Sequence, residues 1–200
     1  MSARDEILAR VRSALADADT SEVHVPRGYR ARRTPEGLAG RFAGRVEDYR
    51  ATVSRCADED LVRTVANALP TGARVVLPPG LPLDVPGVVD EDFAAATLDG
   101  YDAVVTTATV AIAETGTIVL THGAGEGRRA LSLVPDLHVC VVRADQVVPD
   151  VPQAIAFLGA PAYHDRPQTW ISGPSATSDI ELDRVEGVHG PRTLHVVLVG

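Results

Sequence analysis

The fold is decided at residues 73–80, which read Ala-Arg-Val-Val-Leu-Pro-Pro-Gly. The first five residues form a short, mostly apolar run that Pro-Pro-Gly ends, as expected for a strand buried on both faces. Similar runs occupy residues 103–106, 137–142, 169–172 and 194–199. A helix is expected over residues 151–158, after Pro149 and before Gly159. Strands interspersed with helices predict an α/β fold with a layered open sheet.

Residues 109–120 differ from the other runs, because they predict an inserted antiparallel hairpin. The apolar residues 110–112 and 118–120 flank Ala113-Glu114-Thr115-Gly116-Thr117, where Gly116 supplies the positive φ of a turn. Strand alternation puts Glu114 on the same side as Val110 and Ile112, where a carboxylate needs a partner or a ligand. Two interpretations of Glu114 stay open, a base or nucleophile with a raised pKa and an exposed hairpin edge.

Three helices are expected before the first strong strand, the run that begins at Ala73. Ser2 and Asp5 form a capping box for a helix over residues 2–16, whose apolar face can pack on its own domain or on a partner. Thr34-Pro35-Glu36 begins a second helix that should reach about residue 56. Three acidic residues at positions 58–60 then begin a third helix, which ends at Pro70. We expect residues 1–33 to form a helix and a flexible linker, and residues 34–200 to form the α/β domain.

The composition excludes several classes of protein. A chain of 200 residues with 45% hydrophobic residues can bury a full core without disulfides or metals. Its net charge of −8 argues against nucleic acid or an anionic membrane as the main partner. One arginine-rich stretch, residues 27–33, is either a solvated linker or a docking arm. Neither an apolar run of membrane-spanning length nor a secretory leader is present, so we expect a cytoplasmic protein.

Cysteine and histidine usage predicts no resident metal or cofactor. Cys56 and Cys140 lie far apart in the sequence and form no CxxC pair, and an iron–sulfur cluster commonly takes four thiolates. The histidines show no HxH, HxxxH or HExxH spacing. We therefore expect buried, inert thiols. His195, within an apolar alternation, is expected to be a hydrogen-bonded histidine of the sheet.

The candidate ligand-binding residues lie in three loops. The first follows the run at 169–172 and is rich in glycine and hydroxyl groups; it is either a ligand-facing loop or a turn that caps the next element. The second, residues 121–129, is glycine-rich and mobile in this interpretation, and it ends in two arginines that could clamp a carboxylate or simply face solvent. The third holds a histidine between two glycines. Together with the hairpin turn, these loops supply the candidate residues Thr115, Gly116, Arg128, Gly173, Ser175, Thr177, Asp179, Glu181 and His189.

Three sequence blocks resemble the lactate utilization protein C family of LUD domain proteins. They are the hairpin block 113–120, the loop block 173–181 and the C-terminal block 187–198, in this order. The resemblance implies an α/β fold similar to the NagB/RpiA/CoA-transferase group. It also implies a role in oxidising L-lactate to pyruvate beside two iron–sulfur proteins.

Two functions are therefore considered. In the first, the chain is a non-redox accessory subunit of a lactate-oxidising system that binds a small carboxylate or its iron–sulfur partners. In the alternative, it is a transferase or cyclo-ligase that binds a CoA ester, a nucleotide or a folate at the 173–181 loop. Glu114 would then be the nucleophile or base, and Arg128 the anion clamp. This second function rests on analogy of fold.

Overall fold

The computed structural model describes residues 2–19, 25, 36–174, 176–177, 185–187 and 189–200. The chain divides into two units, Met1–Arg32 and Arg33–Gly200. None of the described helices is long and apolar enough to cross a membrane.

Helix α1 (Ala3–Ala14) is the structured element of the first unit. Its N-terminus is held by the predicted capping box, in which the Asp5 amide donates to Ser2 Oγ and the Ser2 amide donates to Asp5 Oδ2, at 3.3 and 3.0 Å. No residue of α1 is buried. The apolar side chains predicted to share one face are all exposed; they are Ile7, Leu8, Val11 and Leu15.

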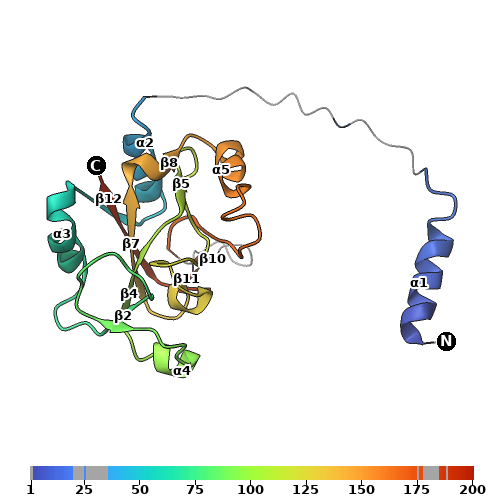
Figure 1. Ribbon diagram of the computed structural model, residues 1–200, viewed down its shortest axis with the longest axis horizontal. Helices are drawn as coiled ribbons and strands as arrows, with labels where there is room; N and C mark the ends of the chain where they lie inside the picture. The colour runs from blue at the N-terminus through green and yellow to red at the C-terminus, as the bar shows by residue number, and fades with distance from the viewer. Residues whose placement is uncertain (1, 20–24, 26–35, 175, 178–184, 188) are drawn as a thin grey trace. The chain divides into compact units, whose positions relative to one another are not determined.

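The second unit is built on a six-stranded sheet in which every pairing is parallel (Figure 1). Its strand order is β1-β12-β7-β4-β2-β3. This arrangement confirms the predicted α/β class. The bounds are Thr52–Cys56 for β1, Val75–Leu77 for β2, Val88–Val89 for β3, Ala103–Thr107 for β4, Leu137–Arg143 for β7 and Thr193–Val199 for β12.

A second sheet of four strands, in the order β8-β5-β6-β9, contains the predicted hairpin. Strands β5 (Val110–Ile112) and β6 (Thr117–Leu120) pair antiparallel, and Gly116 adopts the predicted positive φ, at 62°. Strands β8 (Val147–Val148) and β9 (Thr169–Ile171) form the two edges of this sheet. The short strands β10 (Ala176–Thr177) and β11 (Val185–Glu186) pair only with each other in the described part of the chain.

The layers follow from alternation along the main-sheet strands. One face packs against α3 (Leu61–Ala68), with Val105, Val139 and Val197 beneath it. The other face packs against α2 (Leu38–Asp48) and the second sheet. Helix α5 (Val151–Leu158), at its predicted position, covers the second sheet's remaining face. The short elements are α4 (Ala95–Leu98) and the 3-10 turns η1 (Asp58–Asp60), η2 (Arg129–Ser132) and η3 (Ala144–Gln146).

The expected second helix was wrong at its C-terminal end. Helix α2 ends at Asp48, because Arg50 adopts a left-handed conformation with a φ of 66° that interrupts the helix. Residues 52–56, which the helical spacing included, instead pair in parallel with β12. A strand that the sequence did not predict therefore lies between α2 and α3, although three of the described α-helices do precede β2, the strand predicted at residues 73–77. The expected helix start at Thr34 and Pro35 lies outside the described residues, and the N-cap of α2 is Gly37.

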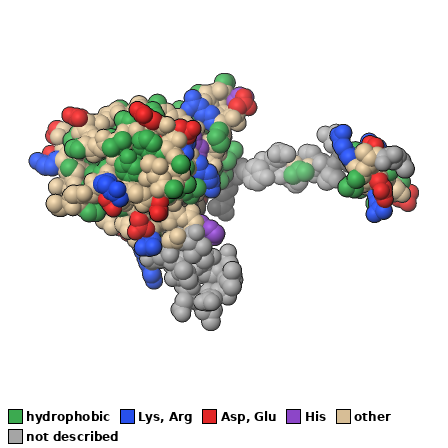
Figure 2. Space-filling view, turned by 90° about the horizontal axis from the view of Figure 1, so that it is seen from below, with side chains coloured by type: hydrophobic (Ala, Val, Ile, Leu, Met, Phe, Trp, Pro, Cys, Tyr) green, Lys and Arg blue, Asp and Glu red, His purple; other side chains and the backbone are tan. Residues whose placement is uncertain are grey.

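Figure 2 shows one face of the molecule, with side chains coloured by type. Acidic and basic side chains of the described residues are interspersed there with apolar ones. This face therefore presents no extended field of one sign in the described part of the chain.

Candidate functional site

A cavity of about 270 Å³ lies beside the amino ends of two central strands. His138 of β7 and Leu194 of β12 are register neighbours in the main sheet, and both line the cavity. The end of β9 and the loop after it form one wall, and η2 forms another. The polar side chains around the cavity are those of Arg129, Ser132, His138, Thr169, Ser172 and His189.

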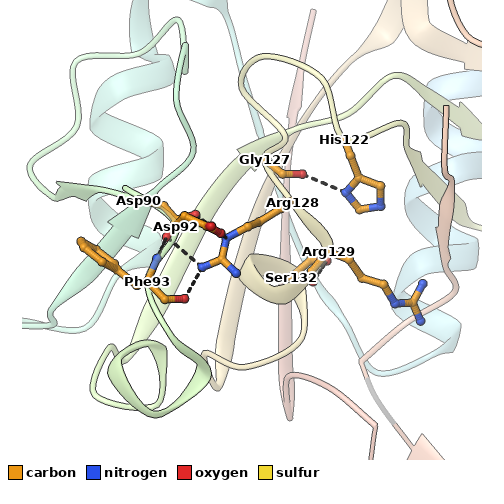
Figure 3. A network of polar contacts seen from close by, with 8 residues as sticks. All are labelled: Asp90, Asp92, Phe93, His122, Gly127, Arg128, Arg129 and Ser132. Atoms are coloured by element: carbon orange, nitrogen blue, oxygen red, sulfur yellow. Dashed lines mark hydrogen bonds and ion pairs between the residues drawn. The ribbon is translucent and has the colours of Figure 1, made fainter.

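The two arginines at the end of the glycine-rich loop point in opposite directions (Figure 3). Arg128 forms a bidentate ion pair with Asp90, with its Nε and Nη2 at 2.7 and 3.0 Å from the two carboxylate oxygens. It also donates to the carbonyl of Phe93. These hydrogen bonds from Arg128 hold the pKa of the buried Asp90 carboxyl below its usual value. The predicted ligand residue Arg128 thus fastens the loop to the segment between β3 and α4.

Arg129 instead lies at the cavity. Its Nη1 donates to Thr169 Oγ1 at 3.2 Å, and the residue is exposed. An exposed guanidinium at the edge of a small cavity can bind a carboxylate through two parallel hydrogen bonds. Of the two arginines considered from the sequence, Arg129 is therefore the one placed for a ligand in this cavity.

His122 contacts the hydroxyl of Thr169, the group that orients Arg129. Its Nδ1 lies 2.8 Å from the carbonyl oxygen of Gly127, which can only accept, so Nδ1 carries the proton. In the neutral imidazole, Nε2 then accepts from the Thr169 hydroxyl, which lies 2.8 Å away. The oxygen of Thr169 is left to accept from Arg129. His122 has a φ of 57°, a conformation uncommon outside glycine and typical of residues held by their surroundings.

His138 is a buried titratable group at the cavity. It is 1% exposed, and burial lowers its pKa to about 4, so the imidazole is neutral near pH 7. Its Nε2 lies 2.8 Å from Thr106 Oγ1, and its Nδ1 has no hydrogen-bond partner among the described residues. His138 therefore has one ring nitrogen left to donate to or accept from a ligand.

Cys140, which follows His138 on the same face of β7, has an unreactive thiol. Thr106 Oγ1 lies 3.6 Å from its Sγ and 2.8 Å from His138 Nε2, and the single hydroxyl proton goes to one or the other according to the tautomer of His138. Burial raises the pKa of the Cys140 thiol to about 12, so the nucleophilic thiolate is scarcely formed at neutral pH. The expectation of an inert buried thiol holds for this residue.

A row of hydroxyl groups joins the hairpin turn to the cavity. Thr117 Oγ1 lies 2.7 Å from Thr115 Oγ1 and 2.8 Å from Ser172 Oγ, and Ser172 lines the cavity. Gly116 is needed for packing, because a Cβ there would lie 2.8 Å from the carbonyl carbon of Arg45 at the end of α2. Thr115 and Gly116 thus lie behind the cavity wall.

The other predicted site residues fall in three groups. Gly173 and His189 line the cavity. Glu114 is exposed and does not line it; its backbone amide donates to the carbonyl of Pro149. Ser175, Asp179 and Glu181 lie outside the described residues, and of Thr177 only the backbone pairing in β10 is described.

The loop after β9 reaches the cavity by a different route from the one expected. The sequence suggested a ligand at the carboxyl end of a main-sheet strand, but β9 belongs to the second sheet. Its carboxyl end meets the amino ends of β7 and β12 across the cavity. His195, by contrast, is the hydrogen-bonded sheet histidine that was predicted, with Nε2 at 2.8 Å from Ser54 Oγ.

Sequence reasoning missed His122, His138, Thr169 and Ser172 as site residues. His138 did give a signal, since it is the one strongly polar side chain inside the apolar run 137–142. A polar residue at a position buried on both faces needs a partner, and this rule could have singled it out. Thr169 and Ser172 gave no such signal, because threonine and serine are ordinary at strand ends.

Comparisons with known proteins identify the family of this chain. The family model of the LUD domain matches residues 86–199, which include every residue lining the cavity. A lactate utilization protein C from Deinococcus radiodurans is 49% identical over 167 residues, covering 80% of this chain and 78% of that protein. The chain belongs to the LUD domain family. The family resemblance seen in the sequence is thereby confirmed.

Two further proteins are similar to this LUD domain protein. A lactate utilization protein C from Geobacillus sp. (strain WCH70) is 34% identical over 99 residues, which are 48% of this chain and 41% of that protein. A crystal structure of a DUF162 family protein from Deinococcus radiodurans superimposes with a TM-score of 0.69 at 40% identity. The superposition covers 82% of this chain and 96% of that one, and supports the α/β class. The specific likeness to the NagB/RpiA/CoA-transferase group stays a prediction.

Proposed function

We propose that this LUD domain protein serves in lactate utilization, where it binds a small α-hydroxy or α-keto carboxylate in the cavity between Arg129 and His138. The similarity to a protein named for lactate utilization, 49% identical over most of both chains, supports the process. The observation that carries the ligand class is the pairing of an exposed guanidinium with a buried neutral imidazole at one small cavity.

The two groups suit the two ends of such a ligand. Arg129, oriented by Thr169, offers a fork of N–H donors to the carboxylate. His138 offers Nδ1 to the oxygen on the neighbouring carbon. In the neutral ring, this nitrogen donates to a keto oxygen in one tautomer and accepts from a hydroxyl in the other. L-Lactate and pyruvate differ only at that oxygen and its carbon, so the cavity can hold both.

We assign the oxidation itself to partner proteins and give this chain an accessory, non-redox role beside iron–sulfur proteins. Of its two cysteines, Cys140 is held as an un-ionised thiol by burial. The role belongs to the domain proposed over residues 34–200, with residues 1–33 as a helix and linker outside it. Oxidising L-lactate to pyruvate removes two electrons and two protons, which the partners would accept while this chain holds the carboxylate.

Titration calorimetry with L-lactate and with pyruvate tests the ligand. We expect saturable binding of both, and at least a tenfold loss of affinity in Arg129→Gln, because the carboxylate loses its only arginine contact in the described cavity. Arg63→Gln is the matched control. Arg63 is an exposed arginine of α3 that pairs with Asp60 and does not line the cavity. Unchanged affinity in Arg129→Gln would contradict the proposed ligand site.

Co-purification tests the partners. The chain is tagged at its chromosomal locus, and its host is grown on L-lactate before gentle lysis. Mass spectrometry should then recover two cysteine-rich iron–sulfur proteins in amounts similar to the tagged chain. Recovery of the chain alone would count against the accessory role and favour a free-standing enzyme.

A further inference from the structure

A second cavity, of about 250 Å³, lies at the opposite end of the main-sheet strands. It is lined by residues 107–109, which follow or end β4, by parts of the loop 121–126, and by Gln146, Tyr163 and Arg166. The chain passes from β2 to β3 on one side and then returns to β4 on the other side of β2. The carboxyl ends of strands at such a reversal are where open α/β sheets bind ligands.

The glycine-rich loop is fixed over these strand ends. The Thr107 amide donates to the carbonyl of Gly125 at 2.8 Å, and the Gly125 amide donates to the carbonyl of Pro79 at 3.0 Å. Gly125 itself has a φ of 77°, and a Cβ there would lie 2.8 Å from Thr107 Oγ1. The loop predicted as mobile is thus hydrogen-bonded to the ends of both β2 and β4.

Glu126 places a buried carboxylate in the wall of this second cavity. It is 4% exposed. Its Oε1 accepts from Thr109 Oγ1 at 2.5 Å, and its Oε2 accepts from the Thr121 amide at 2.6 Å. All of its donors are neutral, and no lysine, arginine or histidine lies within ion-pair distance among the described residues. A buried carboxylate without a cation is costly, so a cationic group seated against it would be favoured.

Arg166 places the opposite charge at the same cavity. It is exposed, its guanidinium lies 6.0 Å from the centroid of the Tyr163 ring, and it forms no ion pair among the described residues. Gly123 lies between the two charges. Its amide is 3.4 Å from Glu126 Oε2, and a Cβ on it would be 2.7 Å from Arg166 Nη1. The carboxylate and the guanidinium therefore flank one glycine without pairing with each other.

We propose that this second cavity binds a small zwitterionic amino acid, with its ammonium group on Glu126 and its carboxylate on Arg166. A simple carboxylate would leave Glu126 without a cation, and a simple amine would leave Arg166 without an anion. A zwitterion satisfies both charges at once. A cavity of about 250 Å³ has room for a short side chain as well. This site shares no residue with the cavity proposed for lactate and pyruvate.

The test is calorimetry on the full chain with glycine, L-alanine and L-serine as probes. We expect saturable binding of at least one of them, and at least tenfold weaker binding of acetate and of methylamine. Arg166→Gln should weaken amino acid binding at least tenfold without loss of fold, because Arg166 is exposed. Glu126→Gln should do the same, with Arg166→Gln deciding the outcome if the Glu126 variant does not fold.

Crossed variants separate the two sites. Arg129→Gln should leave amino acid binding unchanged while it weakens lactate and pyruvate binding, and Arg166→Gln should do the reverse. Failure of all three amino acids to bind would overturn this inference and leave the proposed function standing. Loss of amino acid binding in Arg129→Gln but not in Arg166→Gln would overturn it too, because the amino acid would then occupy the first cavity.

Discussion

Arg128 and Arg129 are neighbours in the sequence but lie in two regions of the molecule whose electrostatic surroundings differ. On the Arg128 side, the buried carboxylate of Asp90 accepts hydrogen bonds from two guanidinium nitrogens, so this arginine stabilises the fold. On the Arg129 side, one nitrogen contacts a threonine hydroxyl and the rest of the fork faces a cavity. The ion-pair partner, more than the residue type, thus decides which cation remains for a ligand. Substitutions should accordingly cost stability on the first side and ligand affinity on the second.

The largest effect is expected on the Arg128 side. Asp90→Asn should lower the free energy of unfolding by about 3 kcal/mol, because it removes the buried carboxylate that holds a half-buried guanidinium at two nitrogens and leaves Arg128 only the exposed Asp92, whose Oδ1 lies 3.3 Å from Arg128 Nε. Asp58→Asn is the control. It removes the partner of Arg143 in an exposed pair, so its cost should be clearly smaller than that of Asp90→Asn. Urea unfolding of the two variants measures both values, and equal losses would refute the structural role given to Arg128.

A pH-dependent effect of similar size is expected beside Arg129. The pKa of His138 is about 4 in the folded protein and near 6.5 in the unfolded chain. Between these values the unfolded chain binds the extra proton, so stability falls as the pH falls. The loss attributable to His138 should reach roughly 3 kcal/mol near pH 4.

Urea unfolding at several pH values between 7 and 4 measures this loss. His138→Gln should show a shallower fall of stability over the window than the wild type does. His195→Gln is the control; burial lowers the pKa of His195 as well, but this histidine is only half-buried. Identical slopes in the wild type and His138→Gln would show that His138 is not buried as a neutral group.

A smaller effect should mark the cavity wall at Gly173. Gly173→Ala should cost about 2 kcal/mol, because the residue has a φ of 79° and a Cβ there would lie 2.5 Å from Tyr49 Cβ. Gly37→Ala is the matched control, since Gly37 has a φ of 71° but a Cβ there would meet no atom within 4 Å. The cost there should be about 1 kcal/mol. If thermal unfolding gave equal losses for both, packing against Tyr49 would not be the cause.

The smallest effect is expected on the Arg129 side. Thr169→Val removes the hydroxyl that joins His122 to Arg129 but keeps the shape of the side chain. We expect about a fivefold loss of pyruvate affinity, or about 1 kcal/mol, because Arg129 loses its orienting contact. The control is Thr64→Val on α3, which removes a hydroxyl that donates to the carbonyl of Asp60. It should leave pyruvate affinity unchanged. Calorimetry showing the same affinity for both variants would argue against an orienting role for Thr169.

Much of the fold could be predicted from the sequence, because apolar runs and turn residues are local signals. The runs at 103–106, 137–142 and 194–199 became β4, β7 and β12, and the capping box at Ser2 formed as expected. The failure at residues 52–56 has a physical reason. Val53 and Cys56 fit helical spacing as well as they fit a strand, and only pairing with β12 decides between the two.

The candidate site was harder to predict, because it is assembled by the packing of two sheets. Gly173 and His189 were found from their loops, but His138 and Thr169 meet only once the second sheet lies against the first. The choice between Arg128 and Arg129 depended on Asp90, which lies 38 residues earlier in the chain. Such long-range partners leave no periodicity in a sequence.

The most direct test of the central claim is a crystal structure of the full chain with pyruvate. We predict a carboxylate within about 3.2 Å of the Arg129 guanidinium and a keto oxygen within about 3.2 Å of His138 Nδ1. Arg128 should remain paired with Asp90. Pyruvate bound instead on Arg166, or on Arg128 with its ion pair to Asp90 broken, would contradict the proposed site.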